Sequence, residues 1–204
     1  AGATASAPPE EALEASVGTL SLTARSQSEG SPRCEWAACV EQWDQWLAGY
    51  SAPPLESTER LNYAGGVSVA FRDWCEVLAP VASANAAHRT RLVEAVESGA
   101  SMRLAFQAYQ ACDGGCRGCL RWQGGELLGF VAAVFGRLGL VGPAEAPIYQ
   151  MFAHFDKCQD MRLGVGECLS LVDALLRGCF RAGAAERPQA PEAAAPEPSA
   201  ASPP

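Results

Sequence analysis

The chain has 204 residues, of which 49% are hydrophobic and 19% charged, and its formal net charge is -8 at pH 7. This size and apolar content allow one medium domain or two small ones with a buried core, whereas the acidic balance argues against a nucleic-acid binder, which needs a basic patch to neutralise phosphates. The longest apolar run, residues 127–141, contains Arg137 and is shorter than the ~20 residues of a membrane-spanning helix, so we expect no membrane span.

Both ends of the chain lack large apolar side chains. Residues 1–32 and 181–204 are dominated by Ala, Pro, Ser, Glu and Gly. Such segments cannot offset the entropy cost of ordering, and we predict that both are disordered tails. The first residue is Ala rather than Met, so a leader segment could be missing from this sequence.

Residues 33–98 have mainly helical periodicity. The pattern predicts helices over 34–47, 67–81 and 89–96, and only the short run 65–69 indicates a strand. Three tryptophans lie on one side of the first predicted helix. They either pack into the core, which the apolar pattern favours, or form an anchor that fills a hydrophobic groove. These tryptophans are Trp36, Trp43 and Trp46.

The nine cysteines are an odd number and lie at apolar positions as often as in loops. This distribution indicates reduced thiols that act as small hydrophobic side chains rather than a disulfide framework. A reducing, cytoplasmic setting follows as an expectation.

Residues 99–180 divide into two similar halves, at about 102–136 and about 147–180. In the second half, one helical apolar face precedes Asp156 and another follows Glu167. The first half has the same offsets around Asp113 and Glu126. One helix–loop–helix unit cannot cover its own apolar face, so the repeat supplies its partner within the same chain.

The loop from Asp156 to Glu167 has twelve residues, with Asp160 at position 5 and the apolar Leu163 at position 8. Helix phase, loop length and the closing glutamate together resemble the EF-hand superfamily of calmodulin-like calcium-binding proteins. The resemblance covers residues 102–180. It implies an all-α fold with a C-terminal EF-hand pair, in which the two loops touch through a short two-stranded contact of Leu163 with Leu120 or Trp122.

The resemblance implies a calcium site in the second loop. Its Cys158, at position 3, offers a soft thiol where calcium prefers a hard oxygen. Met161, at position 6, replaces a glycine with φ > 0, at a cost of about 1 kcal/mol. We therefore expect weak, millimolar to high-micromolar binding. The implied ligands are Asp156, Cys158, Asp160, the backbone carbonyl of Arg162, and Glu167.

The first loop departs further from the family pattern. Counted from Asp113, position 6 is Gly118, but position 5 is Arg117, a cation directed at the place of the metal, and Glu126 comes two residues late. A fourteen-residue loop closed by Glu126 resembles the variant hand of the calgranulin-type calcium proteins. Asp113 and Glu126 are therefore weaker metal candidates, and the alternative is a purely structural partner hand.

A second constellation is C-x3-C-x2-C, a spacing that radical S-adenosylmethionine enzymes use for an iron–sulfur cluster. No strand–helix alternation follows it, and only 85 residues remain after its last cysteine, which argues against that fold. A thiolate zinc or redox site, completed by Cys158, stays open, as does a set of loop thiols without partners. No catalytic motif occurs elsewhere, and we expect no enzyme. The three cysteines are Cys112, Cys116 and Cys119.

The sequence thus predicts calcium binding by a low-affinity sensor or a calcium-modulated interaction module. In a sensor, calcium would draw in Glu167, swing the following helix and expose a groove for a helical peptide or protein partner. The alternative is a non-catalytic adaptor whose hands are vestigial. The groove would be lined by Phe152, Leu171 and Leu175.

Overall fold

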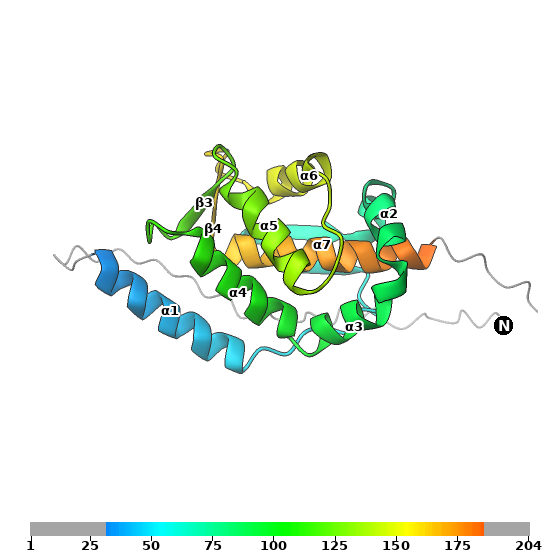
Figure 1. Ribbon diagram of the computed structural model, residues 1–204, viewed down its shortest axis with the longest axis horizontal. Helices are drawn as coiled ribbons and strands as arrows, with labels where there is room; N and C mark the ends of the chain where they lie inside the picture. The colour runs from blue at the N-terminus through cyan, green and yellow to red at the C-terminus, as the bar shows by residue number, and fades with distance from the viewer. Residues whose placement is uncertain (1–31, 186–204) are drawn as a thin grey trace, which may run out of the picture.

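The computed structural model describes residues 32–185 of the chain, so most of the tails predicted at 1–32 and 181–204 lies outside the described residues. Within that range the fold is mainly helical, with two small antiparallel sheets (Figure 1). The helices are α1 (Pro32–Ala48), α2 (Cys75–Ala84), α3 (Arg89–Glu97), α4 (Ala100–Cys112), α5 (Glu126–Arg137), α6 (Glu145–Phe155) and α7 (Val165–Ala185). The strands are β1 (Arg60–Tyr63), β2 (Val67–Ala70), β3 (Cys119–Arg121) and β4 (Arg162–Gly164), and short 3-10 turns are η1 (Ala64–Gly66), η2 (Phe71–Trp74) and η3 (Ala86–His88).

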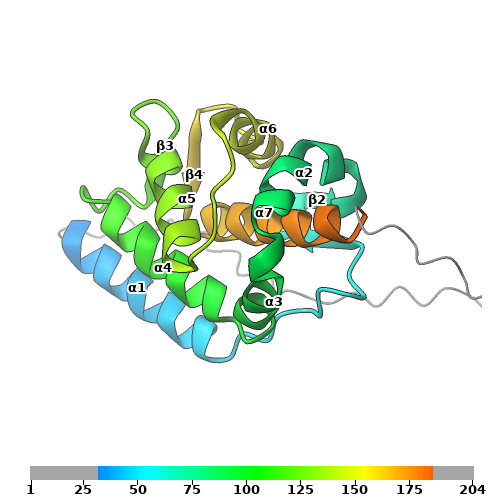
Figure 2. The same cartoon turned by 45° about the vertical axis from the view of Figure 1, so that its right-hand side comes forward.

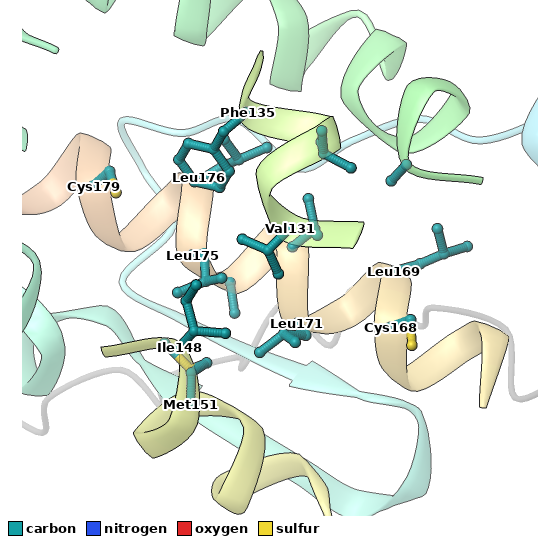
Figure 3. Packing of buried hydrophobic residues seen from close by; sticks show 14 of the residues in the cluster. Val131, Phe135, Ile148, Met151, Cys168, Leu169, Leu171, Leu175, Leu176 and Cys179 are labelled. Atoms are coloured by element: carbon teal, nitrogen blue, oxygen red, sulfur yellow. The ribbon is translucent and has the colours of Figure 1, made fainter. Parts of the chain in front are cut away.

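Helix α7 is the central element of the fold (Figures 1 and 2). Every residue from Cys168 to Phe180 is buried, and α2, α3, α4, α5 and α6 all contact this helix. A helix that is buried on all sides forms the core of a domain rather than one of its faces. In Figure 3, side chains of α5 and α6 surround it, with Val131, Phe135, Ile148 and Met151 near Leu171, Leu175 and Leu176.

In the N-terminal region, the helices predicted over 34–47 and 89–96 are confirmed as α1 and α3. The predicted helix over 67–81 is wrong in its first half, because 67–70 form β2, which pairs with β1. The side chains of Val67 and Val69 are buried and alternate with partly exposed neighbours, a period of two that belongs to a strand. Gly65 and Gly66, at φ 80° and 74°, form the tight connection between β1 and β2. Pro80 lies inside α2 rather than ending it.

Helix α7 continues beyond residue 180, where the sequence led us to expect a tail. Residues 181–185 are helical, so that predicted boundary is wrong. The guanidinium of Arg181 donates hydrogen bonds of 2.8 Å to the backbone carbonyls of Glu56 and Thr58. These long-range contacts hold the last turns of α7 in place, and composition alone does not reveal them.

The second half of the fold consists of two helix–loop–helix units, α4–β3–α5 and α6–β4–α7. Strand β3 pairs antiparallel with β4, with Leu120 opposite Leu163, and both side chains are fully buried. The backbone N–H of Trp122 adds a hydrogen bond of 3.0 Å to the carbonyl of Met161. The two loops therefore lie side by side at one end of the molecule (Figure 1).

Helix α1 lies alongside α4 in both views (Figures 1 and 2). The indole of Trp43 packs against Phe106 of α4, with 6.2 Å between ring centroids, and Trp46 contacts both Trp43 and Tyr50. The core interpretation is confirmed for these two tryptophans, which are partly buried against the main core. The side chain of Trp36 lies outside the described part of the structure.

Candidate functional site

The second loop begins at Asp156, directly after α6. Its carboxylate is 7% exposed and accepts backbone hydrogen bonds from Asp160 at 3.2 Å and from Met161 at 3.0 Å. Gln159 and Met161 have positive φ values of 54° and 61°. The left-handed conformation expected at Met161 is confirmed, and for a non-glycine residue it costs about 1 kcal/mol.

The first loop has the same backbone design around Asp113. This carboxylate accepts backbone hydrogen bonds from Arg117 at 2.9 Å and from Gly118 at 2.8 Å. Cys116 and Gly118 have φ values of 49° and 72°. In both loops the fourth and sixth residues are therefore left-handed, and the amides of the fifth and sixth residues bind the first aspartate.

The loops differ in length, yet their closing glutamates make the same contact. Glu126 Oε2 accepts the backbone N–H of Arg121 at 3.0 Å, and Glu167 Oε2 accepts that of Gly164 at 2.9 Å. Arg121 and Gly164 are both the ninth residue of their loops. The first loop has two extra residues before its glutamate, and glycines at 124 and 125, with φ of 119° and 74°, give the bend there. Glu126 is thus equivalent to Glu167 in space.

The charge distribution separates the two loops. In the first loop, Arg117 Nη2 is hydrogen-bonded to Glu126 Oε1, and its Nε lies 3.9 Å from Asp113 Oδ1. The second loop has Asp160 at the position of Arg117. Its Oδ1 accepts a local backbone hydrogen bond, from Arg162 at 3.1 Å. A guanidinium therefore bridges the carboxylates of the first loop, and a third carboxylate stands at that position in the second.

The pKa values of the two closing glutamates move in opposite directions. Hydrogen bonds from the Arg121 amide and the Arg117 guanidinium hold the pKa of Glu126 below its usual range. Burial raises the pKa of Glu167, the negative charges of Asp156 and Asp160 raise it further, and the Gly164 amide offsets part of this rise. The second loop thus has excess negative charge and a half-buried carboxylate that would gain from a cation.

The residues predicted as second-loop ligands share one loop, but their side chains are not gathered around a point. Cys158 and Asp160 are exposed, Arg162 lies in β4, and Glu167 lies in the first turn of α7. Across residues 32–185, no group of three or more His, Cys, Asp or Glu side chains is placed to hold a metal ion. A cation would therefore have to draw Asp160 and Glu167 toward Asp156.

The cysteines of the alternative thiolate site are free and partly buried at positions 112, 116 and 119, and Cys158 is exposed. Among the residues that the structure describes, these thiols do not form a group placed to hold a metal ion. Burial raises the pKa of the Cys112 thiol and of the nearby buried Cys168 thiol, which disfavours the thiolate form that binds metals and reacts. The structure gives this alternative no support.

A buried polar network on α7 is absent from our sequence predictions. Arg177, whose side chain is fully buried, donates to Asp173 Oδ2 at 2.8 Å and to the carbonyl of Pro53 at 2.9 Å. The hydroxyl of Tyr63 donates to the same carboxylate oxygen at 2.7 Å. Burial and the charge of Asp173 raise the pKa of Tyr50 to about 12. An Asp and an Arg four residues apart in an apolar helix are the sequence signal for such a pair.

The residues predicted to line a groove that calcium would expose are buried in this structure. Phe152 is 1% exposed, and Leu171 and Leu175 are fully buried. Among the described residues, the large hydrophobic side chains that are exposed are Val141 and Tyr149, at 54% and 44%. No helix in the described part of the chain is long and apolar enough to cross a membrane.

Comparisons with protein-family models, with curated proteins and with solved structures found no significant match to this chain.

Proposed function

We propose that the chain is an EF-hand-like calcium-binding protein in which the second loop, from Asp156 to Glu167, binds the ion. The observation that carries the proposal is the structural equivalence of the two loops together with the greater negative charge of the second. Both loops fold around a first aspartate and a closing glutamate, but only the first has a guanidinium between these carboxylates. The second loop has the negative charge that calcium neutralises.

The ligands in this proposal are hard oxygen atoms, which calcium prefers. Asp156 and Asp160 contribute side-chain oxygens, Arg162 its backbone carbonyl, and Glu167 closes the site with both carboxylate oxygens. Cys158 contributes little because its thiol is soft. The missing ligand and the rearrangement needed to gather the carboxylates place the Kd at about 10⁻⁴ to 10⁻³ M, or roughly -5.5 to -4 kcal/mol of binding free energy.

Between a sensor that opens and a module that calcium stabilises, the burial of α7 favours the module. Opening would expose Leu171 and Leu175, which are fully buried, and would break the hydrogen bonds that join Arg177 to Pro53 and Tyr63 to Asp173. Calcium would instead order the second loop and strengthen the existing packing. The protein would then act as a calcium-modulated interaction module without catalysis.

The second candidate is a non-catalytic adaptor with vestigial hands. Three features favour the adaptor. Met161 has a strained left-handed backbone, Cys158 offers a thiol instead of an oxygen, and the acidic side chains are separated from one another within the described range. In this candidate the two loops serve only to pair the helix–loop–helix units through β3 and β4.

Isothermal titration calorimetry with calcium distinguishes the two candidates. We expect the wild-type protein to bind one equivalent with a saturable heat, and Glu167→Gln to lose that heat. The matched control is Glu145→Gln, an identical change at an exposed position in the first turn of α6, which should leave binding unchanged. No saturable heat up to several millimolar calcium, or full binding by Glu167→Gln, would support the adaptor instead.

A further inference from the structure

The first loop contains its own cation. We propose that the guanidinium of Arg117 occupies the cation position of this loop, so that the loop is a latent calcium site held closed without metal. The inference rests on the proposed function only for the likeness of the two loops. It adds that one residue, rather than the loop backbone, keeps calcium out.

The position of Arg117 supports this assignment. Its guanidinium contacts Asp113, the first residue of the loop, and Glu126, the closing residue. A calcium ion in such a loop makes the same connection between the first and last carboxylates.

The charges at the equivalent positions agree with this role. In the first loop, Asp113, Arg117 and Glu126 sum to -1, from two carboxylates and one guanidinium. In the second loop, the three equivalent residues are carboxylates and sum to -3. The closed first loop therefore needs no divalent ion, and the guanidinium would repel one that approached.

The backbone turn of the first loop can form without an arginine at position 117, although the guanidinium contacts with Asp113 and Glu126 stabilise it. The turn is held by the amides of Arg117 and Gly118, which bind Asp113, and any residue at 117 retains its amide. Gly115 provides room for the arginine, because a Cβ atom at 115 would lie 3.3 Å from Arg117 Cγ. The side chain of Arg117 thus folds back over the third loop position, where a typical hand has a ligand.

A permanently closed first loop has a consequence for its neighbour. Strand β3 of the closed loop pairs with β4 of the second loop, so part of the second loop is ordered before calcium arrives. Preorganisation of this kind reduces the ordering cost of binding. We therefore expect binding of a single equivalent without cooperativity, rather than the two coupled events of a fully active pair.

The test is Arg117→Asp, which gives the first loop the same acidic residue at position 5 as the second. The matched control is Arg103→Asp, with the same change of charge on α4, where the guanidinium of Arg103 donates a hydrogen bond to the nearby carbonyl of Ser98. In titrations with calcium and with terbium, Arg117→Asp should bind one equivalent more than the wild-type protein, and Arg103→Asp should not. Equal stoichiometry in Arg117→Asp and wild type would overturn the inference.

This outcome is separate from that of the proposed function. If the wild-type protein binds no calcium, the proposed function fails, yet Arg117→Asp should still gain one equivalent. If the wild-type protein binds one equivalent and Arg117→Asp gains none, the inference fails and the proposed function stands.

A second variant keeps the test valid if Arg117→Asp does not fold. Arg117→Gln removes the cation without adding a ligand, at a side chain that is 36% exposed. In the metal-free protein, we expect the amide of Gly118 to exchange with solvent at least about 10-fold faster than in wild type. The amide of Gly164, in the second loop, should change less. An unchanged exchange rate at Gly118 would overturn the inference.

Discussion

The ion pair of Asp173 with Arg177 offers a quantitative test of how α7 is held. Arg177→Met replaces the guanidinium with an apolar side chain of similar length. It leaves the Asp173 carboxylate buried, with only the hydroxyl of Tyr63 to bind it. Removal of one partner from a buried ion pair costs about 3–5 kcal/mol. Since total stability is roughly 5–15 kcal/mol for a domain, this variant should unfold at a much lower denaturant concentration.

The double variant Asp173→Leu/Arg177→Met distinguishes the net contribution of the ion pair to stability from the penalty of leaving one buried charge unpaired. Both charges disappear, and the hydroxyls of Tyr63 and Tyr50 and the carbonyl of Pro53 lose a partner. Within the described residues, Asp173 Oδ1 already has no hydrogen-bond partner, so the pair is imperfectly satisfied. Replacement of a buried pair by apolar side chains is often close to neutral, and the double variant should be about 2 kcal/mol more stable than Arg177→Met.

The assay is urea unfolding at pH 7, followed by fluorescence and circular dichroism, with the free energies of unfolding combined in a double-mutant cycle. A double variant as unstable as Arg177→Met, or less stable, would refute the reasoning. It would show that the Asp173–Arg177 ion pair makes a net contribution to the folding free energy that apolar side chains cannot replace.

Three further predictions concern the second loop. The raised pKa of Glu167 lies above its ordinary value of 4.5, so the neutral form is favoured in the folded state, and stability is lost as the pH rises through the folded pKa. Metal-free Glu167→Gln should therefore be more stable than wild type at pH 7 and lose this advantage below about pH 4.5; a less stable variant at pH 7 would contradict this. For a Kd of about 1 mM, ~10 mM calcium should add ~1.4 kcal/mol to the unfolding free energy, and magnesium at the same concentration is the control. Cys158→Asp should tighten calcium binding by on the order of 10-fold, since it adds a hard ligand; calorimetry that finds unchanged affinity would show that position 3 does not face the ion.

The loops could be predicted closely from the sequence because each feature depends on local spacing. Asp113 and Asp156 end apolar helical faces, and the apolar residues after Glu126 repeat the offsets found after Glu167. That repeat revealed the equivalence of the two glutamates despite the longer first loop. The backbone contacts of Arg121 and Gly164 give the same alignment.

The rest of the fold depends on contacts between distant segments. The sequence indicates a strand at 65–69, and β2 confirms it from Val67 onward, but the helical periodicity of the following segment also extends over Val67 and Val69, so the local pattern does not decide between strand and helix there. Arg177 and Arg181 bind carbonyls more than 120 residues away in the chain, and no local pattern indicates such partners.

The central claim is that the second loop binds calcium while the first is closed by Arg117. A calcium titration of the wild-type protein, followed by NMR of the glycine amides, tests both halves at once. Gly164 donates to Glu167 and Gly118 donates to Asp113, so each amide reports on one loop. The account predicts a saturable shift of the Gly164 resonance with a midpoint near the millimolar range, and little change at Gly118. A flat response at Gly164, or a larger shift at Gly118, would contradict it.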